Sequence, residues 1–522
     1  MNGMSAGYLA GALFCGGCCA VFAVPAACCA QAASAAGPVA ITRAGRVRGC
    51  VESGINVFKG IPYGADTAGR RFQAPLSHDP WEGVRDAVGF GSESPQPTVN
   101  PDGSNAGELV HQGEDCLNLN VWTPALRDGQ KRPVLVYLHG GGFDGGSGES
   151  ANGLFLSRRG DVVVITVNHR LNGFGYLYLA GLGGPEFADS GNAGMLDLVL
   201  ALHWVRDNAA EFGGDPANVT LFGQSGGAAK CAVLMAMPAA RGLFQHAWAM
   251  SGPMLSGLRP DQATAQARAV LKKLGIPLDR VDAIKTVPMR ALVAAMDGGN
   301  WAPVTDREVL PRDPFSPDAS PLSADIPLVL GTTHDEMHSL LARLPALGAL
   351  TWQSLPKALE SLRPPDTSYT ASEILDEYRR LYPDYSPSDV FLAARTASRL
   401  WIGIVAESER RAAQAAPTYD YCVNWPGGLN AVHAIDLPLV FNDIDSNALT
   451  ESAAGAHALA DLMSDSLVAF ARTGNPNTSA LPHWPQFNVR KRPTMVFDLP
   501  PRIENDPRAD ERRIFASAVT PG

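Results

Sequence analysis

The stretch Gly223-Gln224-Ser225-Gly226-Gly227 decides the fold, because it joins a strand-like run to a helix-forming run. The apolar run Val219-Thr220-Leu221-Phe222 precedes it, and the alanine-rich run 228–234 follows it. Glycines two places before and two places after the serine let the backbone reverse sharply and lift a hydroxyl clear of a sheet. The pattern predicts that Ser225 is a nucleophile at the apex of a strand-turn-helix unit. Such pentapeptides also occur by chance in glycine-rich loops, so this interpretation requires partners elsewhere in the chain.

A serine hydroxyl is a weak nucleophile at neutral pH, so it requires a general base, an orienting acid and donors for an oxyanion. The glycine-rich stretch His139-Gly140-Gly141-Gly142-Phe143 follows the apolar run 134–138. Successive glycines can turn backbone N–H groups into a cavity with no side chain in the way. We therefore expect Gly141, Gly142 and Gly226 to bind the developing alkoxide. Without the downstream serine, a flexible glycine turn would be the better interpretation.

Together, these two motifs resemble the type-B carboxylesterase and lipase family, the branch of the α/β-hydrolase fold that includes the cholinesterases. The resemblance runs from about Arg46 to about Phe497. Its other matching segments, in chain order, are Val57-Phe58-Lys59-Gly60-Ile61-Pro62-Tyr63, Arg71-Phe72 with Pro75, Pro80-Trp81, Glu114-Asp115-Cys116-Leu117-Asn118-Leu119-Asn120, Val167-Asn168-His169-Arg170-Leu171, Gly191-Asn192 with Leu196-Asp197, Phe212-Gly213-Gly214-Asp215-Pro216 and Phe470-Ala471-Arg472-Thr473-Gly474-Asn475-Pro476. The resemblance implies an α/β-hydrolase fold, with a mostly parallel central sheet, flanking helices and helical cap insertions.

The same resemblance implies a chain order of serine, acid and histidine, usually with glutamate as the acid. The carboxylate pair Asp335 and Glu336 follows the strand-like run 328–332. By motif position Glu336 is the expected orienting acid and Asp335 its local competitor; a solvated acidic pair at a helix start is the alternative. Among eleven histidines, His433 stands in a segment that resembles the family's catalytic-histidine loop, and it is the predicted base.

Other polar residues at family-like positions have a predicted structural role. Arg71 with Glu114, and Arg170 with Asp197, match positions that the family uses for internal salt bridges. Ser251 matches a position behind the catalytic residues. Its side chain there either forms a hydrogen bond with the catalytic groups or belongs to a capped turn.

Gln224 is the other residue expected just behind the catalytic groups. Cholinesterase-like members usually carry a glutamate at this position, so the present chain has a neutral amide in place of a charge. Because an anion there would attract cationic substrates, its absence predicts a preference for neutral esters over choline esters.

Length and composition are consistent with one large catalytic domain over 38–522. The chain has 522 residues, of which 46% are hydrophobic, and this is enough to bury a large core. Strand-like runs alternate with helical stretches, which favours a mostly parallel sheet covered by helices. The predicted strands are 134–138, 162–167, 219–222, 328–332, 419–423 and 494–497, and the predicted helices are 192–212, 263–274, 289–296, 374–381 and 390–416. Helical insertions around 255–325 and 340–415 are expected to build a cap and a gorge wall.

The charge distribution excludes some classes of partner. The net charge is −10, and no basic stripe supplies the footprint of a nucleic-acid-binding protein. No internal apolar run is long enough to span a membrane. The expected partner is a small-molecule ester, and the oligomeric state is left open.

The first 42 residues contain no Asp, Glu, Lys or Arg, and their middle is rich in Ala, Leu, Val, Phe and Cys. This composition predicts an export signal over 1–35, cleaved after Ala32 or Ala35, and a secreted or periplasmic protein. A basic segment at the start is missing, so an incorrect start codon or an unusual leader is one alternative. A lipid anchor on Cys28 or Cys29 is another.

Five of the nine cysteines lie in this leader, which leaves Cys50, Cys116, Cys231 and Cys422 in the mature chain. The protein is therefore not a disulfide-rich scaffold. In the family, the cysteine of the Glu-Asp-Cys segment usually bonds to a cysteine before a Pro-Gln pair, and Ser94 stands at that place here. The resemblance thus implies that Cys116 has lost its partner. The cysteine spacing fits no zinc site, and neither a metal nor an organic cofactor is expected.

The sequence predicts a serine carboxylesterase that hydrolyses neutral esters of small to medium size through an acyl-enzyme intermediate. A catalytically silent, cholinesterase-like binding protein is the alternative from another class. An amidase or a long-chain lipase would use the same catalytic residues.

Overall fold

An eleven-stranded sheet runs through the computed structural model, which describes residues 37–97, 111–341, 345–364, 366–427, 429–451 and 453–519. The strand order is β14-β13-β12-β11-β10-β9-β7-β8-β6-β4-β3. All pairs from β13 to β8 in this order are parallel, and the strands at both ends pair antiparallel. The strands are β3 (Cys50–Glu52), β4 (Ile55–Pro62), β6 (Asn118–Thr123), β7 (Arg132–Leu138), β8 (Val163–Val167), β9 (Gly214–Gln224), β10 (His246–Met250), β11 (Leu328–Thr333), β12 (Thr418–Val423), β13 (Pro493–Phe497) and β14 (Arg502–Asn505). A separate small sheet has the order β1 (Val39–Ile41), β2 (Arg46–Arg48) and β5 (Val84–Asp86).

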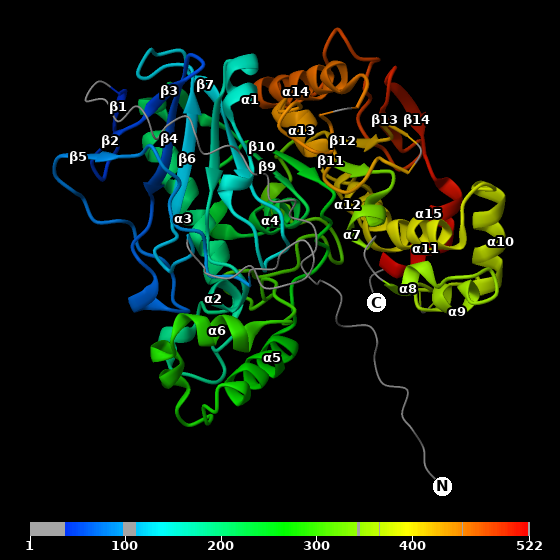
Figure 1. The fold of residues 1–522 in the computed structure, drawn as a ribbon, viewed down its shortest axis with the longest axis horizontal. Helices are drawn as coiled ribbons and strands as arrows, with labels where there is room; N and C mark the ends of the chain where they lie inside the picture. Colours follow the sequence, from blue (N-terminus) through cyan, green and yellow to red (C-terminus); the bar gives the residue numbers. More distant parts are fainter. Residues whose placement is uncertain are drawn as a thin grey trace.

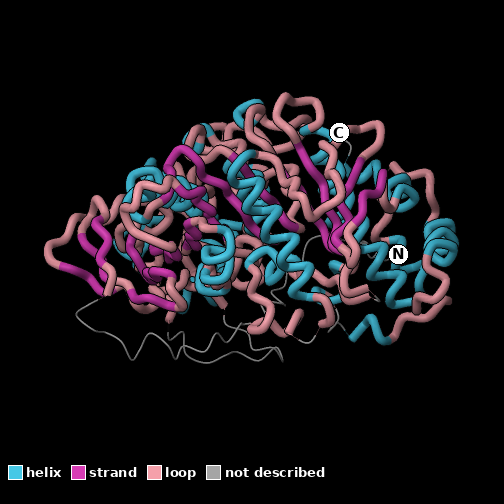
Figure 2. The backbone as a smooth tube through the Cα atoms, turned by 90° about the horizontal axis from the view of Figure 1, so that it is seen from above, coloured by secondary structure: helices cyan, strands magenta, loops and turns pink. Residues whose placement is uncertain are grey.

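Helices cover both faces of the large sheet, and its strands follow one another through the middle of the molecule (Figures 1 and 2). The helices against the sheet are α1 (Leu154–Gly160), α2 (Asn172–Tyr176), α3 (Ala193–Asn208), α4 (Gly226–Leu234), α12 (Ile402–Arg411), α13 (Asp436–Phe441) and α14 (Ala456–Thr473). The remaining helices are α5 (Pro260–Lys273), α6 (Met289–Met296), α7 (Glu336–Leu340), α8 (Pro345–Gly348), α9 (Leu355–Glu360), α10 (Ala371–Leu381), α11 (Pro387–Thr396) and α15 (Ala509–Phe515). Together with the parallel strands, these helices form the α/β-hydrolase fold that the sequence predicts.

Strand β7 illustrates how the sheet separates two hydrophobic cores. Val134, Val136 and Leu138 belong to one core with residues of α3 and α4, whereas Leu135 and Tyr137 belong to the other with residues of α14. All five side chains are buried, because successive residues of a strand point to opposite faces and both faces are covered. A continuous apolar run is therefore what the position of this strand requires.

The predicted strands are all present, but β9 begins at Gly214, earlier than the apolar run indicated. In the large sheet, β3, β4, β6, β10 and β14 were not predicted, and neither was the small sheet. In β10 the residues are His-Ala-Trp-Ala-Met, and alanine has little preference for strands. In β4 the register shifts between Phe58 and Ile61, which breaks the period of two.

The helix expected over 390–416 is divided. Helix α11 ends at Thr396, a π-helical turn spans Ala397–Trp401, and α12 begins at Ile402. An alanine-rich run carries no residue that marks such a change of helix type, so the sequence did not reveal it. Figure 1 shows α5 and α6 together at one end of the molecule and α8, α9 and α10 at another. A cap or gorge-wall role for these two helical segments stays a prediction.

Both internal salt bridges that the resemblance implied are confirmed. Arg71 Nε donates to Glu114 Oε2 at 2.7 Å, and Arg170 Nη2 donates to Asp197 Oδ1 at 2.6 Å. Arg170 and Asp197 are 2% and 0% exposed, so removing either one would leave a buried charge unpaired, a loss on the order of 3–5 kcal/mol. Among the described helices, none combines the length and apolar character needed to cross a bilayer.

Among the described residues, the thiols of Cys50, Cys116, Cys231 and Cys422 are buried and form no disulfide, in agreement with the prediction that Cys116 has lost its usual partner. Burial raises the pKa of the Cys116 thiol, and a hydrogen bond with the Ser94 side chain opposes this rise. Ser94 therefore lies within hydrogen-bond reach of the thiol whose usual partner it replaces.

We expect Ser94→Cys to form a disulfide with Cys116 under oxidising conditions and to raise the free energy of unfolding by roughly 2–4 kcal/mol. Part of this stabilisation will be lost, because the substitution removes the Ser94 hydroxyl, which accepts a hydrogen bond from Leu171 N at 3.0 Å. Urea unfolding with and without a reductant measures the gain. The double variant Ser94→Cys/Cys116→Ser is the control, and a gain that survives in it, or in reductant, would contradict the assignment.

Candidate active site

Ser225 occupies a sharp turn between β9, which ends at Gln224, and α4, which begins at Gly226. Its φ is 56° and its ψ is −122°, a conformation that a non-glycine residue adopts only when its surroundings enforce it. The surroundings do so here, because Ser225 N donates to Met250 O at 2.7 Å and Ser225 O accepts from Ala229 N at 3.2 Å. Ser225 is partly exposed while its neighbours Gln224 and Gly226 are buried. The turn therefore presents a fixed, accessible hydroxyl.

The glycines of this turn are required by close backbone contacts. A Cβ on Gly223 would lie 2.4 Å from Gly227 C, and one on Gly227 would lie 1.9 Å from Leu138 O. A Cβ on Gly226 would lie 2.1 Å from Gly142 O. These contacts bring the first turn of α4 against the end of β7 and the glycine loop that follows it. No other residue type fits at these positions without moving the backbone.

The glycine loop after β7 has two successive residues in the left-handed region, Gly141 with φ 85° and Gly142 with φ 62°. Gly141 O accepts hydrogen bonds from the N–H groups of Asp144 and Gly145. Within the described residues, the N–H groups of Gly141 and Gly142 donate to no protein acceptor. The N–H of Gly226 belongs to the first turn of α4, where a helix leaves donors unsatisfied. The three N–H groups are therefore available to an anion.

Glu336 and His433 form a buried pair near this loop. His433 Nδ1 lies 2.5 Å from Glu336 Oε2, and Glu336 Oε1 accepts from Thr333 N at 2.8 Å. Glu336 is 0% exposed and follows the end of β11, and His433 lies in the loop after β12. Because β11 and β12 are parallel neighbours, their carboxyl ends place the two loops side by side.

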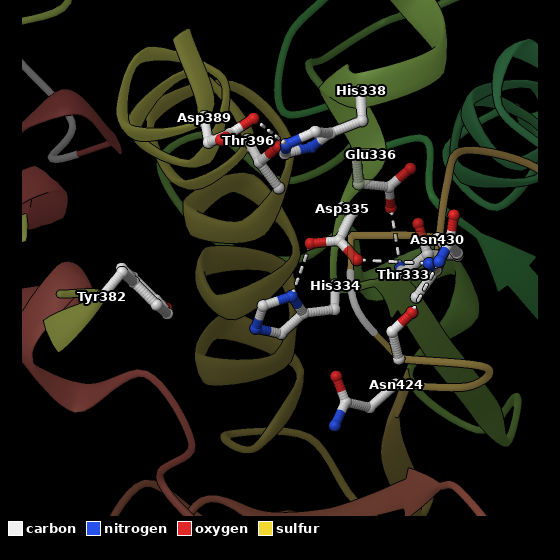
Figure 3. Close-up of polar contacts among 12 residues, drawn as sticks. Thr333, His334, Asp335, Glu336, His338, Tyr382, Asp389, Thr396, Asn424 and Asn430 are labelled. Carbon is white, nitrogen blue, oxygen red and sulfur yellow. Dashed lines mark hydrogen bonds and ion pairs between the residues drawn. The ribbon is translucent and has the colours of Figure 1, made fainter. Parts of the chain in front are cut away.

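Asp335 has other partners than Glu336: Figure 3 shows the Asp335 carboxylate beside His334 and the Glu336 carboxylate beside Thr333. Its Oδ1 lies 2.7 Å from His334 Nδ1, and its Oδ2 accepts from Ala431 N at 3.2 Å. Burial opposes its ionisation, but the His334 hydrogen bond and nearby positive charge hold the pKa of Asp335 below its usual value. The backbone of Asp335 also donates to Ala431 O at 2.8 Å. Asp335 thus anchors the loop that carries His433, whereas the Glu336 carboxylate contacts the imidazole.

Gln224 lies against the other nitrogen of the same imidazole. Gln224 Nε2 is 3.1 Å from His433 Nε2, and no hydrogen bond between the described side chains of Ser225 and His433 is present. An amide N–H can donate to Nε2 only when that nitrogen carries no proton, so Nδ1 carries the proton and donates to Glu336. The arrangement therefore favours the tautomer in which Nε2 is unprotonated, and in this structure that nitrogen faces the Gln224 amide.

Of the two alternatives for Ser251, a hydrogen-bond partner behind the site or part of a turn, the contacts of this residue favour the turn. That hydroxyl is buried and has no partner among the described residues. The backbone N–H of Ser251 instead donates to Gly331 O at 2.8 Å, and its φ is 54°. Ser251 therefore forms the bend at the end of β10, and its backbone N–H extends the pairing of β10 with β11.

Two charged residues that no sequence motif singled out as functional also lie at the site, Asp436 and Lys230. Asp436 accepts a hydrogen bond from Tyr421 OH at 2.8 Å, and burial followed by the Glu336 charge raises the pKa of Asp436 to about 6. Lys230 on α4 donates to His139 O and Gly142 O, each at 2.9 Å. The available signal for Lys230 was a lysine inside an otherwise apolar helix. Within the described ranges, no group of three or more His, Cys, Asp or Glu side chains could hold a metal ion.

The carboxylesterase family model matches residues 36–515. The chain belongs to the carboxylesterase family. It is 35% identical to the para-nitrobenzyl esterase of Bacillus subtilis over 501 residues, which cover 92% of this chain and 99% of that protein. It is 34% identical to the phenmedipham hydrolase of Pseudarthrobacter oxydans over 490 residues, covering 87% of this chain and 93% of that protein.

Solved structures of carboxylesterases share the fold. The crystal structure of a Geobacillus stearothermophilus carboxylesterase at pH 6.2 superposes with a TM-score of 0.81 at 35% identity, covering 91% of this chain and 99% of that one. A solved para-nitrobenzyl esterase gives a TM-score of 0.77 at 33% identity, covering 91% and 99%. The chain is therefore a carboxylic ester hydrolase with the α/β-hydrolase fold, and its substrate is a small-molecule ester.

Proposed function

We propose that this carboxylesterase hydrolyses neutral esters through an acyl-enzyme formed on Ser225, with His433 as general base and Glu336 as orienting acid. The observation that carries this proposal is the buried contact of 2.5 Å between His433 Nδ1 and Glu336 Oε2, beside the turn that presents Ser225. An ionised carboxylate in this position holds the imidazole tautomer and stabilises the imidazolium when it forms.

In the first step, Ser225 Oγ attacks the ester carbonyl carbon and its proton passes to His433 Nε2. The carbonyl oxygen becomes an oxyanion, which the N–H groups of Gly141, Gly142 and Gly226 stabilise. The tetrahedral intermediate then expels the alcohol, which takes the proton from His433. Water repeats the cycle on the acyl-enzyme and regenerates Ser225.

Gln224 supports the preference for neutral esters. It is 4% exposed and its amide contacts the catalytic imidazole, so no side-chain anion stands at that point. A relative that is similar over nearly its whole length is named for para-nitrobenzyl esters, which are neutral. We propose uncharged aryl and benzyl esters with small to medium acyl groups as the substrate class.

We expect Ser225→Ala to lower kcat/KM for a para-nitrobenzyl ester on the order of 10⁴-fold while the protein stays folded. The reason is that the remaining groups can bind the ester but cannot form the acyl-enzyme. Wild-type protein treated with a phosphonate should carry the label on Ser225, located by peptide mass spectrometry. Ser361→Ala, which changes an exposed serine, is the matched control. A label on Ser251, or activity retained in Ser225→Ala, would overturn the proposal.

We expect Gln224→Glu to move the acidic limb of kcat/KM to higher pH, by roughly one pH unit or more. A carboxylate beside the imidazole favours its protonated form, so the base is lost at a higher pH than in the wild type. The wild type should hydrolyse a neutral ester faster than the choline ester of the same acyl group, and the variant should reduce this difference. Thermal unfolding checks that the variant is folded. A limb that stays in place or moves to lower pH in the folded variant would refute the role of Gln224.

We also propose that residues 1–35 are an export leader and that the mature enzyme is secreted or periplasmic. This segment lies outside the described residues, and its uncharged apolar composition supports the proposal. N-terminal sequencing of enzyme recovered outside the cytoplasm should begin at Ala33 or Ala36. Protein that remains in the cytoplasm with an intact Met1 would contradict the proposal of an export leader.

A further inference from the structure

We propose that Lys230 is a positioning residue whose ammonium group fixes the oxyanion-binding N–H groups of Gly141 and Gly142. This inference rests on the proposed function, because it assigns the support of the same oxyanion site. It also gives a buried cation a part in the reaction that none of the sequence motifs indicated.

Lys230 is an unusual residue for its place in the fold. It is 0% exposed and stands in α4, a helix in which every residue is buried. A lysine is rarely buried completely unless its ammonium group is satisfied by acceptors. Here Nζ donates to His139 O and to Gly142 O, each at 2.9 Å, and it lies 5.4 Å from the centre of the Phe143 ring. Its long side chain thus joins the nucleophile helix to the glycine loop.

The two carbonyl groups that Lys230 binds lie on either side of the loop segment whose N–H groups would bind an oxyanion. The first carbonyl belongs to the peptide bond between His139 and Gly140, and the second belongs to the peptide bond between Gly142 and Phe143. The two peptide units between them carry the N–H groups of Gly141 and Gly142. Since glycine has the widest conformational freedom of any residue, these units could rotate if their ends were not held. One ammonium group therefore fixes both ends of the segment.

The other carbonyl groups of the loop are also held, which leaves the orientation of the N–H groups defined. Gly140 O lies 2.8 Å from His139 Nδ1, and Gly141 O accepts from Asp144 N at 3.2 Å and from Gly145 N at 3.1 Å. These contacts are local to the loop. The Lys230 hydrogen bonds, by contrast, connect the loop to α4, alongside the close backbone approach of Gly226 to Gly142.

The charge of Lys230 also favours an anion at this place. Carbonyl oxygens that point toward the first turn of α4 would otherwise create a negative potential where the oxyanion must form, and a fixed cation compensates it in a low-dielectric site. The neighbouring imidazoles do not supply this charge. Burial, followed by the Lys230 charge, lowers the pKa of His139 to about 3, and the same two causes lower the pKa of His169 well below its usual value.

A purely structural role for Lys230 and a positioning role predict different kinetics. If Lys230 only fills buried space and satisfies two carbonyl groups, its loss lowers stability but leaves the folded enzyme with normal turnover. If it positions the N–H groups, its loss weakens binding of the transition state more than binding of the substrate. The test therefore compares the binding of the transition state with the binding of the substrate in one Lys230 variant.

We expect Lys230→Met, which keeps the length of the side chain but removes the donors and the charge, to lower kcat about 10²-fold and to change KM less than about threefold. A trifluoromethyl ketone analogue of the ester reports the oxyanion site, because Ser225 adds to its carbonyl carbon and the oxygen becomes an oxyanion. Its affinity should fall by the same factor as kcat. The corresponding methyl ketone, which binds without forming the adduct, should bind with nearly unchanged affinity.

Lys230→Arg keeps donors and charge and should recover most of kcat, and Lys285→Met, which changes a partly exposed lysine paired with Glu186, is the matched control. If Lys230→Met does not fold, Lys230→Gln takes its place, and its kcat should lie below that of Lys230→Arg with the same split from KM. Normal kcat in a folded Met or Gln variant, or a loss confined to KM, would overturn the inference.

The phosphonate label separates this inference from the proposed function. If the wild type is labelled on Ser225 but the Lys230 variants have normal kcat, only this inference is rejected. If the wild type carries no label on Ser225, the proposed function is rejected.

Discussion

The close contact between the first turn of α4 and the end of β7 is the constraint on which the rest of the site depends. Gly227 lies so near Leu138 O that a Cβ there would approach it to 1.9 Å, and Gly226 is in the same relation to Gly142 O. This contact fixes the distance between the serine turn and the glycine loop, which come from segments about 85 residues apart in the chain. It explains why both segments are rich in glycine, because each must bring its backbone to the other without side chains between them.

The parallel sheet provides the second level of organisation. β7, β9, β11 and β12 all end on the same edge, and the oxyanion loop, Ser225, Glu336 and His433 follow these four ends. Parallel strands direct their carboxyl ends the same way, so the sheet gathers loops that are far apart in sequence. The histidine loop needs a further anchor because it begins several residues after β12. Asp335 supplies one through its contacts with Ala431.

Each buried charged group at the carboxyl edge of the sheet has its own hydrogen-bond partners. Glu336 accepts from the backbone of Thr333 and faces His433, while Asp436 accepts from Tyr421, and burial followed by the Glu336 charge raises the pKa of Asp436 to about 6. On the other side of Ser225, the Lys230 ammonium binds two loop carbonyl groups. In the proposed mechanism, the carboxylates thus lie behind the imidazole, where an imidazolium would form, and the Lys230 cation lies behind the glycine loop, where an oxyanion would form. Such a separation of charge matches the charge development of ester hydrolysis.

The sequence by itself determined the strand-turn-helix at Ser225, the glycine loop, most of the parallel strands and the class of reaction. These features depend on local patterns, since a sharp turn requires glycine and a strand buried on both faces requires a continuous apolar run. The resemblance to a family identified Glu336 and His433, which spacing alone did not distinguish from Asp335 and other histidines.

Only the tertiary structure decided how the side chains are oriented. Asp335 and Glu336 are adjacent in sequence, yet one anchors a loop and the other contacts the imidazole, because successive residues at the end of β11 point in different directions. Among the described residues the Ser251 hydroxyl has no hydrogen-bond partner, which leaves the turn as the alternative that the contacts favour, and the role proposed for Lys230 depends on a loop about ninety residues earlier in the chain. Contacts of this kind arise from the packing of distant segments, and a single sequence carries no local signal for them.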